Sequence, residues 1–273
     1  IKHIEAQADI VPLVMGLLGV KLVQESRHVG KYIKENDIVE KKENGDEKGK
    51  LLIPSEKFKG FLELNEKVET TSLAYSLLPI NFVVSFVSQY DAYLGGLIRT
   101  MFISKPEFLN SSEKNILFSE LIKFESIEES HLKQFKWLEN KLGITLRSDL
   151  PSFSDFIEIT ERRNLFVHCN GIISRQYLEV CKENGVKKID KAKLGQKLNA
   201  SPAYFNKCYM VLFEIGVKLG QVIWRKLQPD DIENADSHLN NVCYQLLIKG
   251  HNRLALNLLT FATDTLKKHH DEE

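Results

Sequence analysis

Arginine, asparagine and histidine lie close together in residues 161–171, which read ERRNLFVHCNG. Arginine stays charged at any relevant pH and can contact two phosphate oxygens at once, and histidine exchanges a proton near neutral pH. Arg163 and His168 together therefore suit chemistry on a phosphodiester. If the segment is helical, Glu161, Asn164 and His168 share one face, and Asn164 can orient the imidazole. Arg163 lies about 140° around the helix from His168. Either its long side chain reaches around to the same pocket, or it serves a site shared with another subunit.

The segment resembles the motif of the HEPN superfamily (higher eukaryotes and prokaryotes nucleotide-binding domains), which has arginine, a polar residue, and histidine after four to six residues. Arg163, Asn164 and His168 match it with four intervening residues. The block ERRNLFVHCNGIISRQYL is similar to defence-associated members, and LLPINFVVSFVSQYDAYLGGLIRTMF is similar to the helix that packs on the motif helix. The resemblance covers residues 77–227 and implies a helical core, face-to-face dimers that bring two motifs together, and metal-independent RNA cleavage. Such proteins often act as toxins in antiviral or abortive-infection systems.

A mechanism without a metal or cofactor is consistent with these residues. His168 would take the proton of an RNA 2′-hydroxyl or protonate the leaving oxygen, while Arg163 stabilises the charge on the phosphorane. DNA would be inert because it lacks the attacking group. A symmetric homodimer would supply two histidines, which could divide the acid and base roles. We expect a substrate that is single-stranded RNA or a tRNA loop.

Acidic residues near the motif are candidates for positioning it. Asp91 lies on an otherwise apolar helix and must find a partner there, either an arginine such as Arg163 or Arg99 or an internal hydrogen bond. Glu161 either pairs with Arg162 or faces the pocket. We expect Arg162 itself to be solvated or to lie at an interface.

A cationic stretch follows the motif: residues 182–197 carry six lysines against two acidic residues. Positive charge concentrated there could guide RNA to the site, or the stretch is simply an exposed loop. The candidate RNA-binding residues are Arg175, Lys182, Lys187 and Lys188.

Other chemical groups are better explained by packing or solvation. Tyr204, Phe205 and Tyr209 could stack on bases, but aromatic residues at helical spacing are usually core. Cys169 points about 100° away from His168 on a helix, so we expect it to pack rather than act as a nucleophile. The HHDE stretch at residues 269–272 is expected to be exposed and not to bind a metal.

Apolar spacing of three and four residues dominates the chain and predicts an all-α fold, and residues 31–50, which contain the turn signature Asn44-Gly45, predict a small β-hairpin or loop insertion. The resemblance implies that the helices form a HEPN-like bundle. The apolar stretch 80–103 is predicted to be a core helix that begins at Pro79. Further helices are expected at residues 111–124, at 132–142 before Gly143, at 152–168 with an end or bend at Gly171, and at 203–227. Ser201 followed by Pro202 is the start signal of the last of these. Residues 236–249 and 252–267 form a terminal pair similar to one tetratricopeptide-like unit, which must dock on the body, on a partner or on further chain. The expected domains are residues 1–76, 77–228 and 229–273.

The overall composition sets broad limits. The 37 basic residues balance 37 acidic ones, so the chain cannot hold nucleic acid by uniform charge. Four cysteines without a CxxC pair argue against a zinc ribbon or a disulfide framework, and hence for a reducing cytoplasm. Charged residues inside residues 80–103 argue against a membrane span.

Two other functions remain open. The chain could be a non-catalytic helical module that binds RNA, nucleotide or another protein in a defence or toxin–antitoxin complex. It could also be a toxin that a companion nucleotidyltransferase silences by modifying a residue near the motif.

Overall fold

A computed structural model describes residues 2–36, 38–41, 50–105, 131–147 and 150–266. These residues are mainly helical, which confirms the all-α prediction. The chain forms two compact units, Gln7–Phe82 and Val83–Glu273 together with Ile1–Ala6, and each is described by itself below. The boundary between them falls a few residues beyond the expected division at 76/77, and the terminal helix pair belongs to the same unit as the motif.

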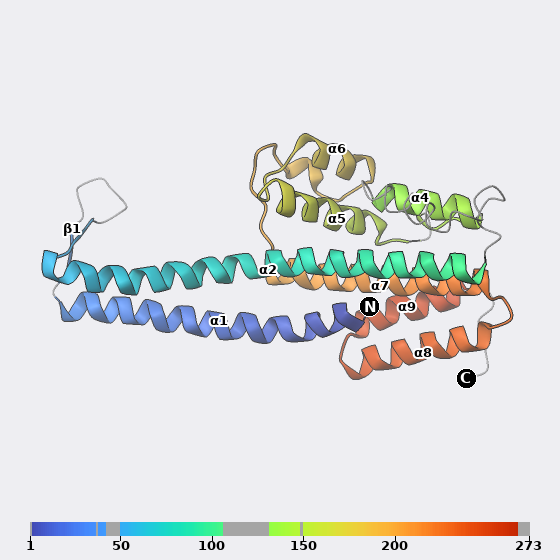
Figure 1. The fold of residues 1–273 in the computed structure, drawn as a ribbon, viewed down its shortest axis with the longest axis horizontal. Helices are drawn as coiled ribbons and strands as arrows, with labels where there is room; N and C mark the ends of the chain where they lie inside the picture. The colour runs from blue at the N-terminus through green and yellow to red at the C-terminus, as the bar shows by residue number, and fades with distance from the viewer. Residues whose placement is uncertain (1, 37, 42–49, 106–130, 148–149, 267–273) are drawn as a thin grey trace. The chain divides into compact units, whose positions relative to one another are not determined.

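The unit Gln7–Phe82 is a helical hairpin. It contains most of α1 (Lys2–Glu35) and the first half of α2 (Ser55–Ser104), which run side by side in Figure 1. Strands β1 (Val39–Lys41) and β2 (Lys50–Leu52) pair antiparallel at the turn end, as expected for the insertion, while the Asn44-Gly45 turn lies outside the described residues.

The expected helix start at Pro79 is wrong, because α2 begins at Ser55 and continues through this proline. A proline removes only one backbone donor, and a long helix that is anchored elsewhere tolerates that loss.

The core of the larger unit forms around the second half of α2. Eight apolar side chains at helical spacing are at most 1% exposed: Val83, Phe86, Val87, Tyr90, Leu94, Ile98, Met101 and Phe102. By length and composition alone, α1 and α2 could each cross a membrane. From Val83 onward, however, the apolar face of α2 is buried in protein, as predicted for a core helix.

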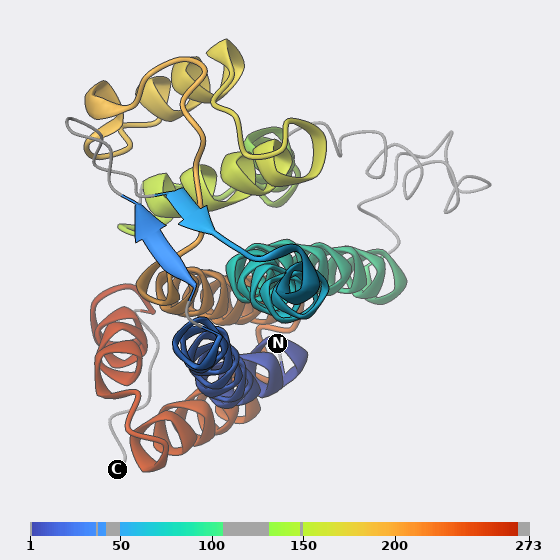
Figure 2. The ribbon, with the colours of Figure 1, turned by 90° about the vertical axis from the view of Figure 1, so that its left-hand side faces the viewer.

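Helix α7 (Pro202–Leu227) lies alongside this half of α2 (Figures 1 and 2). It starts where the Ser-Pro signal predicted, since the Ser201 hydroxyl accepts a hydrogen bond from the Tyr204 backbone N–H at 3.1 Å. Phe86 stacks on Phe205 with ring centroids 4.7 Å apart, and the Tyr93 hydroxyl donates to the Gly216 carbonyl at 2.9 Å.

The terminal pair, α8 (Ile232–Ile248) and α9 (Asn252–Asp264), docks on α7. Asn257 donates to the buried carboxylate of Glu214 at 2.8 Å, and Lys218 pairs with the same carboxylate at 2.7 Å. The buried leucines of the pair are Leu239, Leu246, Leu254 and Leu258, whereas Leu247 and Leu259 are 48% and 38% exposed.

Helix α4 (His131–Leu142) buries Phe135, Leu138 and Leu142 and ends at Gly143, whose φ is +61°, as predicted. The helix expected at residues 111–124 lies outside the described residues. A further helix, α6 (Arg175–Glu183), and the short 3-10 helix η3 (Ile189–Lys191) were not predicted.

Candidate active site

The motif lies on α5 (Phe153–His168), close to the start predicted from Ser152. Its N-terminal half is held by aromatic contacts, with Phe156 5.1 Å from Tyr90 and 5.4 Å from Phe135 between ring centroids. This packing fixes the helix against α2 and α4. The residues that follow are therefore presented at a defined place on the surface of the bundle.

The end of α5 is a left-handed turn. Asn170 and Gly171 have φ of +49° and +76°, and the Gly171 N–H donates to the Leu165 carbonyl at 2.9 Å. A β-carbon on Gly171 would lie 2.8 Å from the backbone oxygen of Leu198, so the turn also needs glycine for space. The predicted helix end is confirmed, and it places His168 in the last turn.

Arg163 is anchored by Asp91. Its Nη2 lies 2.6 Å from Asp91 Oδ2, and the two side chains are 20% and 33% exposed. Both alternatives left open for Asp91 are present in the structure: the ion pair with Arg163 and a hydrogen bond to a side chain of the interior. Arg163 Nε is buried and has no hydrogen-bond partner in the described part of the chain, so the guanidinium is held on one side by a single carboxylate.

A third group, His131, completes this cluster and was missed by sequence reasoning. Its Nε2 lies 2.6 Å from the other carboxylate oxygen of Asp91, and its side chain is only 7% exposed. The imidazole packs edge-on against Phe156, with ring centroids 5.6 Å apart. Asp91 therefore bridges α4 and α5 from its place on α2. No sequence signal distinguished His131, because its partner is 40 positions away.

Glu161 is buried beside the same cluster. Burial raises the pKa of its carboxyl above the ordinary value of 4.5, and the charges of His131 and Arg163 partly oppose this rise. The Glu161 carboxyl therefore interacts with the charges of Arg163 and His131. The structure does not show the pairing of Glu161 with Arg162.

Arg162 pairs with Glu158 instead. Its Nε and Nη2 both lie 2.6 Å from Glu158 Oε1, and its guanidinium stacks 4.0 Å from the ring centre of Tyr204. The hydroxyls of Tyr177 and Tyr204 donate to the same carboxylate at 2.9 and 3.0 Å. The expectation of a solvated Arg162 was wrong, because α6 and α7 close over it.

The aromatic residues considered for base stacking belong to the protein interior. Phe205 and Tyr209 are 5% and 1% exposed, as the core interpretation predicted. Burial and the neighbouring Glu158 carboxylate raise the pKa of the Tyr204 hydroxyl, which favours its role as a donor to Glu158.

Asn164 is half-buried and His168 is exposed. Among the described residues no hydrogen bond or ion pair joins either of them to Arg163, and Asn164 does not bond the His168 imidazole. The structure therefore brings Arg163 together with Asp91 and His131 but not with His168. The turn of the helix separates the motif cation from the motif histidine within one chain.

The four candidate RNA-binding residues are all exposed, on α6 and in the segment that follows it: Arg175, Lys182, Lys187 and Lys188. This segment packs on the end of α5 through a small buried cluster that includes Leu165, Tyr177 and Cys181. It therefore carries its positive charge next to the end of the motif helix.

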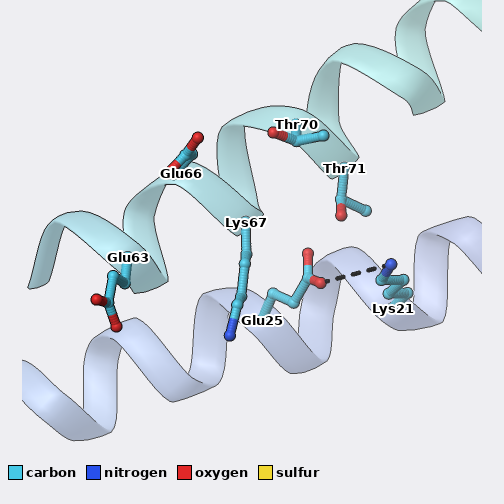
Figure 3. Close-up of a pocket in the computed structure, with 7 residues that line it drawn as sticks. All are labelled: Lys21, Glu25, Glu63, Glu66, Lys67, Thr70 and Thr71. Atoms are coloured by element: carbon cyan, nitrogen blue, oxygen red, sulfur yellow. Dashed lines mark ion pairs between the residues drawn. The ribbon is translucent and has the colours of Figure 1, made fainter. Parts of the chain in front are cut away.

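A separate polar cavity of about 410 Å³ lies in the helical hairpin between α1 and α2 (Figure 3). Figure 3 shows Lys67 extending from α2 towards α1, near the ion pair between Lys21 and Glu25. The charged residues that line the cavity are the two lysines and three glutamates, Glu25, Glu63 and Glu66. The excess of carboxylates disfavours phosphate there, so this cavity is not the candidate site.

Within the described residues no three histidine, cysteine or acidic side chains are grouped to hold a metal ion, and residues 269–272 lie outside that part of the chain. Cys169 is half-buried and a free thiol. Comparison with known proteins gave no match: no family model, no curated protein and no solved structure is significantly similar to this chain.

Proposed function

We propose that the protein is a metal-independent endoribonuclease of HEPN type. One observation carries the proposal: α5 presents a guanidinium that Asp91 holds at 2.6 Å, still one-fifth exposed, five residues before the exposed His168. A fixed cation stabilises the charge that builds on a phosphorane, and an exposed imidazole exchanges protons with a ribose hydroxyl or leaving oxygen. Asn164 lies between them and would contact the substrate.

The reacting groups come from two copies of the chain in this proposal. Arg163 and His168 point about 140° apart on one helix, which is too far for both to meet one phosphate easily. A face-to-face homodimer places the end of a second α5 opposite the first, so that one subunit's cation meets the other subunit's imidazole. In this proposal the helices form a HEPN-like bundle. Its terminal pair, α8 and α9, is similar to one tetratricopeptide-like unit.

RNA reaches the site along the basic segment after α5. Lys187 and Lys188 are exposed there together with Arg175 and Lys182, and contacts to phosphate release counterions, so binding weakens as salt rises. We expect single-stranded RNA or a tRNA loop to fit, because a protein reads unstacked bases more readily than an A-form helix.

The test is cleavage of total RNA by the purified full chain, with and without chelator. We expect cutting that resists chelator and leaves 2′,3′-cyclic phosphate ends, and no cutting of an oligonucleotide whose ribose 2′-hydroxyls are removed. His168→Ala and Arg163→Ala should each lose at least about 100-fold in rate. His238→Ala is the matched control, since this exposed histidine lies on α8, away from the motif. Chelator-sensitive cutting, or undiminished cutting by His168→Ala, would overturn the proposal.

The cellular setting follows from the same activity. A nuclease of this kind acts in a reducing cytoplasm as the toxic component of a defence or stress system, and a partner protein or antitoxin keeps it silent. Expression should be toxic, and Arg163→Ala should relieve the toxicity. A mass increase on co-expression with a companion nucleotidyltransferase would identify silencing by modification near the motif.

A second candidate function is a non-catalytic module that binds RNA, nucleotide or a protein. The favouring observation is that Asp91 already neutralises Arg163, while α8 and α9 expose Tyr244, Ile248 and Leu256 at 61–63%. Such a module would be harmless on expression. RNA would remain intact, and substitution of Arg163 would change binding alone.

A further inference from the structure

The imidazole of His131 occupies an unusual place for a residue outside the motif. It lies 2.6 Å from Asp91 Oδ1, while Arg163 lies 2.6 Å from Asp91 Oδ2. The carboxylate is thus held from both sides, by a ring on α4 and a guanidinium on α5. A carboxylate with two donors at this distance has little freedom to rotate.

His131 cannot touch RNA itself. Its side chain is 7% exposed, and Tyr90 and Phe156 cover the ring with centroids 6.4 and 5.6 Å away. Asp91 and Arg163 are 33% and 20% exposed, so His131 is the inner member of the cluster and the two charged groups reach the surface. This order is the one expected when an inner group orients an outer one.

We propose that His131 is a positioning residue: it fixes the Asp91 carboxylate, which in turn holds the Arg163 guanidinium in the direction that a phosphate requires. Arginine is a long side chain with large rotamer freedom, so orienting it before substrate arrives removes that cost from the reaction. The catalytic consequence rests on the proposed ribonuclease function, whereas the restraint of Arg163 does not.

Two substitutions separate this role from simple packing. His131→Phe keeps an aromatic ring against Phe156 but removes the donor to Asp91. His131→Gln loses the ring, but its amide can place a donor near the position of Nε2. If His131 positions Asp91, His131→Gln should keep the restraint on Arg163 that His131→Phe loses. If His131 acts only by packing, His131→Phe should keep this restraint and His131→Gln should lose it.

The first measurement is NMR of the arginine side chains in protein labelled with 15N-arginine, with the Arg163 signals assigned by their loss in Arg163→Lys. Guanidinium rotation in Arg163 should be slow in the wild type and in His131→Gln, and clearly faster in His131→Phe. Rotation that stays slow in His131→Phe would overturn the proposal. If His131→Phe does not fold, the Gln variant decides, because fast rotation there contradicts the inference.

The second measurement is RNA cleavage. His131→Phe should reduce kcat about 10–100-fold with little change in KM, and His131→Gln should stay close to wild type. His238→Phe is the control on an exposed histidine. If the wild type cuts no RNA, the ribonuclease proposal fails, and the NMR result still decides whether His131 restrains Arg163.

Discussion

Replacing Glu158 by glutamine tests how α5 is held in place. The substitution keeps size and shape but removes the negative charge that faces Arg162 at 2.6 Å. The two side chains are only 5% and 17% exposed, so the guanidinium cannot recover full hydration without moving. The tyrosine hydroxyls that donate to Glu158 lose an ionic acceptor as well.

Removing one partner of a buried ion pair costs about 3–5 kcal/mol, because the remaining charge stays in a poorly hydrated place. For a chain of this size such a loss lowers the Tm by about 10 °C. The control is Glu35→Gln on α1, which breaks an ion pair with Lys31 of the same helical spacing at 3.5 Å. Lys31 and Glu35 are both more than half exposed, so we expect Glu35→Gln to change the free energy of unfolding by less than about 0.5 kcal/mol.

Urea unfolding followed by circular dichroism measures both variants. Glu158→Gln combined with Arg162→Gln should cost clearly less than the sum of the single substitutions, because no uncompensated charge then remains. A loss below about 1 kcal/mol for Glu158→Gln alone would refute the assignment of this pair as a main contact of α5.

Three further predictions use other parts of the larger unit. Burial alone would raise the pKa of Glu139, but hydrogen bonds from Arg147 and the backbone lower this pKa below 4.5. The ionised Glu139 therefore stabilises the fold at neutral pH, and this stabilisation is lost as pH falls through the lowered pKa. The destabilisation by Glu139→Gln, measured in urea, should therefore be largest at pH 7 and shrink as pH falls through the lowered pKa, and an effect that stays constant over the whole acid range would contradict this. Gly171→Ala should lower the free energy of unfolding by about 1–3 kcal/mol, measured in urea, because it strains a left-handed turn that has no room for a β-carbon; a neutral result would count against that turn. Burial raises the pKa of Cys181 and Cys208 to about 12, so a thiol reagent should modify the half-buried Cys169 first in the native protein, and equal rates for all three would be inconsistent with the structure.

Local sequence pattern predicted those elements whose stability is itself local. Ser201 before Pro202 marked the start of α7, and Asn170-Gly171 marked the end of α5, because caps and left-handed turns depend on the residues at those positions. The apolar spacing beyond Val83 marked a core helix, since a stripe of that kind must be buried somewhere. The expected start at Pro79 failed because proline is permitted inside a long helix as well as at its first turn.

The residue types and their order determined that a cation, an amide and an imidazole lie near the end of one helix, with a left-handed turn directly after them. Only the tertiary structure decided which partners those side chains have. Asp91 reaches Arg163 across 72 positions and His131 across 40, while Arg162 turns to Glu158 under cover of α6 and α7. Helical periodicity states which residues share a face, but the neighbour of that face depends on how distant elements pack, and an ion pair needs both groups at one point in space.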